Sequence, residues 1–221
     1  GRLNEAAAGY KAVLDKQPGC APALAGLGHA LAVGGRLGQG ERLLREALAI
    51  EPDAPDANLF LAETLFRLHR PKEALGHARR ALEGEPRRCE AHTLAAACLE
   101  RLGRVGEARD HAERAVAGKR RDPEANLMLA TIDARQRRDG PARRRLEELI
   151  DRSTTPEPVR HRALHQLAHL LDRLGEHDAA FACLDRVGRE VGANPAVRRI
   201  DGELVFRRIG AARAVDPALF S

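Results

Sequence analysis

Three histidines are the strongest candidates for metal chemistry in this sequence. His161, His165 and His169 are spaced i, i+4 and i+8, so one face of a helix would carry all three. Imidazoles one helical turn apart can chelate zinc or nickel. The spacing fixes no additional ligand of the usual kind, and the H-E-x-x-H motif is absent from the sequence. We therefore expect no metal ion and no other cofactor, and we interpret these histidines as surface or groove-lining residues.

Groups for covalent catalysis are equally scarce. Serine occurs only at Ser153 and Ser221, and the sequence has neither a glycine-rich phosphate loop nor a nucleophile elbow. The cysteines show neither C-x-x-C nor zinc-finger spacing. They are Cys20, Cys89, Cys98 and Cys183. We expect Cys98 and Cys183 to be buried thiols of a non-enzymatic chain in the cytoplasm, where thiols stay reduced.

The formal net charge of +5 raises the question of an anionic partner. Lys119, Arg120 and Arg121 form a basic run, which six further arginines follow. These are Arg135, Arg137, Arg138, Arg143, Arg144 and Arg145. Single-strand binding also needs aromatic platforms, and the chain has five Phe, one Tyr and no Trp. No apolar run approaches the roughly 18 residues of a membrane span. We expect neither a nucleic acid nor a membrane partner.

An internal repeat determines where all these residues lie. The segment 55–62, PDANLFLA, returns as PEANLMLA at 123–130, an offset of 68 residues or twice 34. A third unit begins on the same step at Cys89. A fixed period of this size indicates a solenoid of stacked repeats. The apolar residues are mainly Ala and Leu, which favour helices over strands.

Apolar spacing and turn residues divide the chain into helix pairs. We predict a half unit at 1–20, followed by units at 21–54, 55–88, 89–122, 123–156 and 157–194. The phase slips by four residues after Thr154. Residues 195–221 form an amphipathic segment that we expect to cap the array. Because the first unit lacks its first helix, we expect the chain to be a fragment of a longer protein.

The repeats resemble the tetratricopeptide repeat, a 34-residue helix pair with small residues at positions 8 and 20 and proline at 32. Position 8 is Gly28, Ala62, Ala96, Ala130 and Ala168; position 20 is Ala6, Gly40, Ala74, Ala108, Ala142 and Ala180; position 32 is Pro18, Pro52 and Pro86. The sequence departs from the pattern where Asn58, His92 and Asn126 replace the large residue at position 4, and where Asp133 replaces Leu at position 11. The resemblance implies an all-α, right-handed α-solenoid of about five helix pairs with a C-terminal capping helix.

The resemblance also implies a concave groove lined by positions 2, 5, 9, 12 and 13 of each first helix. The residues that we expect to line it are His29, Leu59, Glu63, Phe66, Arg67, Thr93, Glu100, Arg101, Leu127, Thr131, Arg135, Arg162, His165, His169 and Arg173. Their charges are mixed, with apolar spots at Leu59, Phe66 and Leu127. This pattern suits a scaffold that holds a peptide or partner protein by a few anchors.

Two alternatives remain open from the sequence. Residues 163–181 are similar to the last repeat of bacterial proteins that join tetratricopeptide repeats to a sulfotransferase domain. In that case the chain would be the non-catalytic arm of a larger enzyme. The second alternative concerns assembly, because an end unit or the tail could also form a homodimer.

Overall fold

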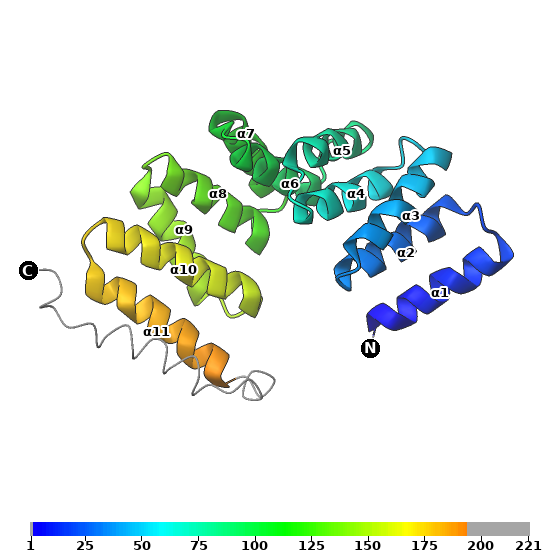
Figure 1. Cartoon of the computed structure of the whole chain (residues 1–221). Coiled ribbons are helices and arrows are strands. Elements are labelled where there is room, and N and C mark those ends of the chain that lie inside the picture. Colours follow the sequence, from blue (N-terminus) through cyan, green and yellow to red (C-terminus); the bar gives the residue numbers. More distant parts are fainter. Residues whose placement is uncertain (1, 194–221) are drawn as a thin grey trace, which may run out of the picture. The chain divides into compact units, whose positions relative to one another are not determined.

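The computed structural model describes residues 2–193, and every regular element within that range is an α-helix (Figure 1). These helices are α1 Arg2–Lys16, α2 Ala21–Val33, α3 Leu37–Ile50, α4 Pro55–Arg67, α5 Pro71–Gly84, α6 Cys89–Arg101, α7 Val105–Gly118, α8 Pro123–Arg135, α9 Asp139–Asp151, α10 Glu157–Arg173 and α11 His177–Ala193. The all-α prediction is confirmed. The predicted capping helix at 195–221 lies outside the described residues.

The helices fall into two compact units. The first unit, Gly1–Thr155, contains α1–α9, and the second, Pro156–Ser221, contains α10 and α11. In the first unit the helices stack in chain order as pairs: α2 with α3, α4 with α5, α6 with α7 and α8 with α9 (Figure 1). The division after Thr155 coincides with the phase slip in the sequence. Stacking of consecutive helix pairs is the architecture of an α-solenoid.

Local sequence explains where the helices begin and turn. Pro55 and Pro123 occupy the first helical turn, where the missing N–H is not needed and φ is already suitable. Between the helices of a pair, one residue adopts positive φ. In three of these turns the residue is a glycine: Gly35 with φ of 89°, Gly103 with 75° and Gly175 with 80°. In two others it is His69 with φ of 60° and Arg137 with 58°. The last two residues accept a backbone conformation that favours glycine.

Small residues allow the two helices of a pair to approach closely. A Cβ atom added to Gly40 would lie 2.6 Å from the carbonyl oxygen of Gly28 and 2.9 Å from the Cβ of Ala32. Later pairs use alanine at the same positions, such as Ala62 and Ala74, and both are fully buried. Leu61, Leu65 and Leu99 complete a core that is continuous from one pair to the next.

The polar residues at position 4 are buried and form a repeated network. Each bonds to a backbone carbonyl oxygen six residues earlier and to a side chain 19 residues later. The side-chain pairs are Asn58 with His77, His92 with His111 and Asn126 with Arg145. The carbonyl acceptors belong to Pro52, Pro86 and Arg120, at distances of 2.9, 3.1 and 2.9 Å. Asn58, His92 and Asn126, which depart from the family pattern, therefore connect the turn before their unit to both helices of that unit.

Asp133 also replaces a core leucine and is compensated by charge. Its carboxylate is 1% exposed and accepts a hydrogen bond from Arg109 of α7. Arg138 and Arg145 lie 3.7 and 4.0 Å away. Burial of an acid is tolerated when such partners surround it.

Candidate functional site

The accessible face of the first unit is formed by α2, α4, α6 and α8. On these helices positions 2, 6 and 13 reach the surface, as does position 9 except at the buried Ala97, whereas position 5 is buried except at the half-buried Thr93. Leu59 is 2% exposed and packs with Ala81 and Ala91, and Leu127 is 0% exposed. The prediction that Leu59 and Leu127 serve as apolar anchors of a ligand is therefore wrong, because contacts within the array already bury both side chains.

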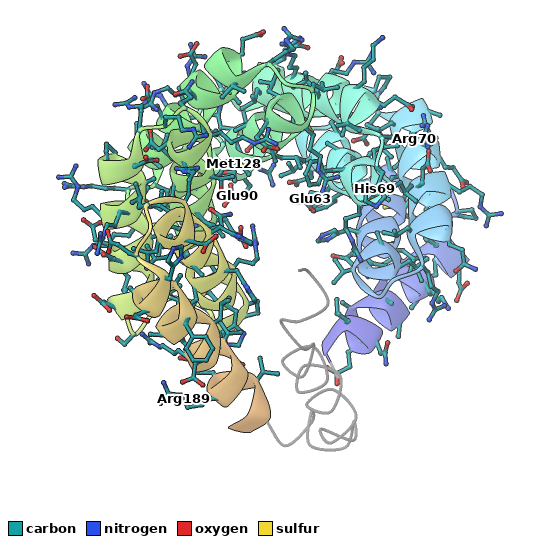
Figure 2. The ribbon with its side chains drawn as sticks, turned by 60° about the vertical axis from the view of Figure 1, so that its left-hand side comes forward. Glu63, His69, Arg70, Glu90, Met128 and Arg189 are labelled. Atoms are coloured by element: carbon teal, nitrogen blue, oxygen red, sulfur yellow. The ribbon has the colours of Figure 1, made fainter. Side chains whose placement is uncertain are left out.

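The accessible apolar side chains occur one residue later in each unit. Phe60, Leu94 and Met128 are partly buried and rest on the core. We call these three residues the apolar row. The ring of Phe60 stacks on the imidazole of His29, with centroids 4.0 Å apart and planes inclined by 4°. Met128 lies on the inner side of the first unit, as do Glu63 and Glu90 (Figure 2).

A cavity of about 630 Å³ continues the apolar row beyond Phe60. Tyr10 and Val13 of α1 form one wall, and Gly26 of α2 together with Phe60 and Asp56 of α4 forms another. The Tyr10 ring lies directly over Gly26, where an added Cβ atom would be 2.3 Å from the ring carbon Cζ. The cavity, which Glu51 also lines, can therefore accept an apolar side chain beside two carboxylates.

Three arginines at position 13 form a second row on the same helices. Arg67, Arg101 and Arg135 each donate from Nη1 to a carbonyl oxygen 35 residues earlier. The acceptors are Ala32 at 2.6 Å, Phe66 at 3.4 Å and Glu100 at 3.2 Å. These carbonyls lie at the C-terminal ends of α2, α4 and α6, where unsatisfied oxygens and the helix dipole favour a cation. We call Arg67, Arg101 and Arg135 the basic row.

Two neighbours of the basic row are predicted groove residues. The guanidinium of Arg101 lies 4.0 Å from the centroid of the Phe66 ring, a cation–π contact that partly covers the ring. Glu100 lies 2.8 Å from Arg135, and its side chain is only 16% exposed. Phe66 and Glu100 therefore mainly contact the arginines, and these contacts leave less of both side chains exposed to solvent.

Carboxylates at position 2 form a third row in the first turns of α4, α6 and α8. This acidic row consists of Asp56, Glu90 and Glu124. Asp56 is 66% exposed and lies 2.7 Å from Arg88, while Glu90 is 53% exposed and lies 3.7 Å from Lys119. A carboxylate near a helix N-terminus is stabilised by the helix dipole.

The centre of the face holds the remaining predicted residues. Glu63 lies 3.5 Å from the imidazole of His29. Thr93 and Thr131 are half-buried, and their hydroxyl groups donate to the carbonyl oxygens of Cys89 and Leu127. The face thus combines fixed hydroxyls, one exposed carboxylate and an imidazole that stacks on an aromatic ring.

The second unit carries the other four predicted residues on one helix. Arg162, His165, His169 and Arg173 are all exposed on α10. His161 differs from them, because its Nε2 atom lies 3.0 Å from Glu190 Oε2 of α11. The three histidines therefore have unequal surroundings. No group of three or more His, Cys, Asp or Glu within residues 2–193 is arranged to hold a metal ion.

The environment of Glu190 is strongly cationic. Burial favours its neutral form, but hydrogen bonds from Arg186, His161 and Arg160 outweigh burial and lower the pKa of the carboxyl. The Arg186 and His161 bonds measure 2.9 and 3.0 Å. This cluster joins α10 to α11 within the second unit.

The thiols differ in their exposure. Burial raises the pKa of Cys98 to about 12, which makes the thiol a poor nucleophile. Burial also raises the pKa of Cys89. Cys183, which we expected to be buried, is only partly buried, because its face of α11 is partly open. No helix among the described residues is both long and apolar enough to cross a bilayer.

The architecture and the three exposed rows define an α-solenoid repeat protein. Sequence profiles of the tetratricopeptide repeat match residues 1–55 and 161–187, and a profile of anaphase-promoting complex, cyclosome, subunit 3 matches residues 39–115. The tetratricopeptide repeat profiles thus match α1–α3 and parts of α10 and α11. Comparison with curated proteins finds no match.

Several solved structures are similar in fold. Pseudomonas aeruginosa PilF has a TM-score of 0.70 at 18% identity, covering 92% of this chain and 90% of PilF. PilW, a type IV pilus biogenesis factor, has a TM-score of 0.74 at 20% identity and covers 90% of both chains. YrrB, a repeat protein described as having an unusual peptide-binding site, has a TM-score of 0.58 at 24% identity, covering 75% of this chain and 83% of YrrB.

Proposed function

We propose that the inner face of the first unit binds a peptide or a segment of a partner protein. The observation that carries this proposal is the apolar row, which leads into the 630 Å³ cavity beside Tyr10. A partly exposed apolar strip between charged rows is typical of a surface that receives apolar anchors from a ligand. The peptide-binding site in the name of YrrB supports the same role for a similar fold.

The chemistry of this face suits recognition. Guanidinium and carboxylate groups provide directional contacts at its edges, and the apolar row provides desolvation at its centre. We infer that the chain acts as a non-catalytic scaffold. We place it in the cytoplasm because Cys20, Cys89 and Cys98 are free thiols, as in proteins of reducing compartments.

Truncation of the apolar row tests the proposal. Peptides selected from a random displayed library against the whole chain should lose about 10-fold in affinity when Phe60→Ala or Met128→Ala removes an anchor. The expected loss follows from the apolar area that each side chain would bury against the ligand. Fluorescence anisotropy with a labelled selected peptide gives the dissociation constants.

The matched control is Arg80→Ala, an exposed position on α5. This variant should bind the selected peptides as the unmodified chain does. Circular dichroism melts establish that each variant remains folded, and Met128→Ala removes the smaller apolar contribution if Phe60→Ala proves unstable. Unchanged affinity in both folded variants would refute the proposal.

The sulfotransferase alternative stays a prediction based on residues 163–181, which form parts of α10 and α11. Reading the parent gene beyond Ser221 tests it. A following strand and a loop rich in Arg, Ser, Gly and Thr would support the alternative, and a stop codon near Ser221 would refute it.

Homodimerisation through an end unit is a separate proposal. Exposed apolar side chains occur on both end helices described, with Leu3 and Val13 on α1 and Phe181 and Leu184 on α11. Sedimentation velocity across a concentration series tests it: a rising sedimentation coefficient that Val13→Ser or Leu184→Ser abolishes is the supporting result. A constant monomer value refutes it.

A further inference from the structure

The three rows of the first unit repeat together on α4, α6 and α8. Each of these helices carries a carboxylate at position 2, an apolar side chain at position 6 and an arginine at position 13. Because consecutive helices of this set are in contact, corresponding residues form continuous lines across them. The apolar row therefore has an acidic row along one side and a basic row along the other.

The separation of the charged rows indicates the width of the ligand. Positions 2 and 13 differ by 11 residues, which is about 16 Å at the helical rise of 1.5 Å per residue. An α-helix with its side chains is about 10–12 Å wide, so it can lie between the rows and reach both with long side chains.

The repeat spacing indicates the periodicity of the ligand. Packed helices lie about 8–10 Å apart, and seven residues of an α-helix rise about 10.5 Å. A ligand helix that crosses α4, α6 and α8 can thus place one apolar residue on each of Phe60, Leu94 and Met128 at steps of about seven residues. Two such steps separate these three contacts, and a third step reaches the cavity beyond Phe60, so the ligand requires roughly 20 residues.

We propose that this face recognises an amphipathic α-helix of about 20 residues whose two polar edges carry opposite charges. Its apolar stripe lies on the apolar row, its lysine or arginine edge follows the acidic row, and its glutamate or aspartate edge follows the basic row. This inference rests on the proposed function and adds the chemistry of the ligand. An apolar residue at one end of the ligand enters the cavity beside Tyr10, since α2 replaces the rows with Pro22, Gly26 and Val33.

The charged rows are able to exchange partners. Each arginine of the basic row uses one N–H for its bond to the carbonyl oxygen, and a guanidinium group has five N–H donors. Asp56, Glu90 and Arg135 are themselves exposed, although Arg88 and Glu100, the partners of Asp56 and Arg135, are only 18% and 16% exposed. The pair of Glu90 with Lys119 is exposed on both sides and contributes little stability, so a ligand charge can replace it at small cost, whereas at Asp56 and Arg135 a ligand charge joins the existing contact.

Three designed peptides test the proposal. All three are helical, about 20 residues long, and carry the same leucine stripe between two polar edges. The mixed peptide has one lysine edge and one glutamate edge, and the two uniform peptides have lysine on both edges or glutamate on both edges. The mixed peptide should bind the whole chain about 10-fold more tightly than either uniform peptide, because only the mixed one opposes both rows with the opposite charge. Uniform peptides that bind as tightly as the mixed one would overturn the proposal.

A charge-reversed protein provides the matched test. In the double variant Arg67→Glu with Arg101→Glu the basic row keeps only Arg135 and becomes net acidic, so the peptide with two lysine edges should become the best ligand. The control Arg80→Glu with Arg114→Glu changes exposed arginines of α5 and α7 by the same charge and should leave the order unchanged. Arg67 and Arg101 also donate to backbone carbonyl oxygens, so the charge-reversed variant can have a lowered melting temperature. In that case the double variant Arg67→Gln with Arg101→Gln replaces it. In this glutamine variant the mixed peptide should no longer bind more tightly than the peptide with two lysine edges.

The experiment separates this proposal from the proposed function. If library-selected peptides bind and lose affinity in Phe60→Ala, but the three designed peptides show no charge preference, the binding function stands and the opposite-edge ligand is wrong. If library-selected and designed peptides alike are indifferent to Phe60→Ala and Met128→Ala, both proposals fail. If the mixed peptide is preferred and reversal of the arginines inverts that preference, both hold.

Discussion

His92 and His111 share a hydrogen bond between two Nδ1 atoms that lie 3.0 Å apart. The Nε2 atom of His92 donates to the carbonyl oxygen of Pro86, so a neutral His92 must accept at Nδ1 and His111 must donate. Burial lowers the pKa of both imidazoles; His92 and the arginines Arg114 and Arg79 lower that of His111 further. This arrangement requires a neutral His92, because protonation of its Nδ1 atom would remove the acceptor for His111.

This pair predicts that stability decreases in mild acid. Since the folded-state pKa values lie below the ordinary value of 6.5, the unfolded chain binds more protons as the pH falls below 6.5. The contribution of the pair is complete above that pH and is lost as the pH falls through the folded-state values. Melting temperatures measured from pH 7.5 to pH 5 should show this decrease.

His92→Asn is the variant that isolates the effect. Asparagine at the equivalent positions 58 and 126 already makes the same carbonyl contact, and Asn58 accepts from His77. The variant should remain folded and lose less stability in acid than the unmodified chain. His165→Asn, which changes an exposed histidine of α10, is the control. An identical decrease in all three proteins would contradict the assignment.

At the scale of elements, the turns between paired helices show how well the repeat pattern is satisfied. Arg137 holds positive φ at the position that Gly35, Gly103 and Gly175 occupy in other turns. Arg137→Gly should raise the free energy of unfolding by about 1 kcal/mol, because the left-handed conformation costs an ordinary residue about that much. Urea denaturation measures the change. Arg137→Ala removes the same side chain and keeps the unfavourable φ, so a similar gain in that variant would show that φ is not the cause.

Helix boundaries were the part of the structure that the sequence predicted best. The predicted unit starts at residues 21, 55, 89 and 123 are the first residues of α2, α4, α6 and α8. Proline and glycine at a constant spacing are local signals, and local signals determine where a helix begins and turns. These four helix starts could therefore be predicted without any knowledge of tertiary contacts.

The accessible rows were harder to predict. A shift of one residue rotates a side chain by about 100° around a helix, and the packing of the next helix pair decides which side remains open. Leu59 and Phe60 are both apolar neighbours, so composition did not distinguish the core residue from the surface residue. The constant separation of 19 between the position-4 residues and their partners was, by contrast, visible in the sequence at Asn58 and His77.

At the scale of the whole molecule, a substitution in one helix pair should change the stability of only the neighbouring helices. The substantial contacts between described helices join helices one or two places apart in the chain. Gly40→Ala should destabilise the chain by about 1–3 kcal/mol, because the added methyl group overpacks the contact with Gly28. The loss of hydrogen-exchange protection should be concentrated in α1–α4 and be small in α7–α9.

Gly76→Ala is the control for that experiment. An added Cβ on Gly76 in α5 meets no atom within 4 Å, so alanine should stabilise the helix by about 0.5–1 kcal/mol. Hydrogen exchange followed by mass spectrometry resolves both effects by segment. A uniform loss of protection across α1–α9 in Gly40→Ala would show that the first unit unfolds as a single cooperative block.

The network at position 4 also affects how such a chain can change its length. Its hydrogen bonds join residues four, six or 19 apart, and each arginine contact spans 35. A gene duplication or deletion of one 34-residue segment therefore restores every one of these bonds in the new register. Recombination between neighbouring copies can lengthen or shorten the binding surface one step at a time.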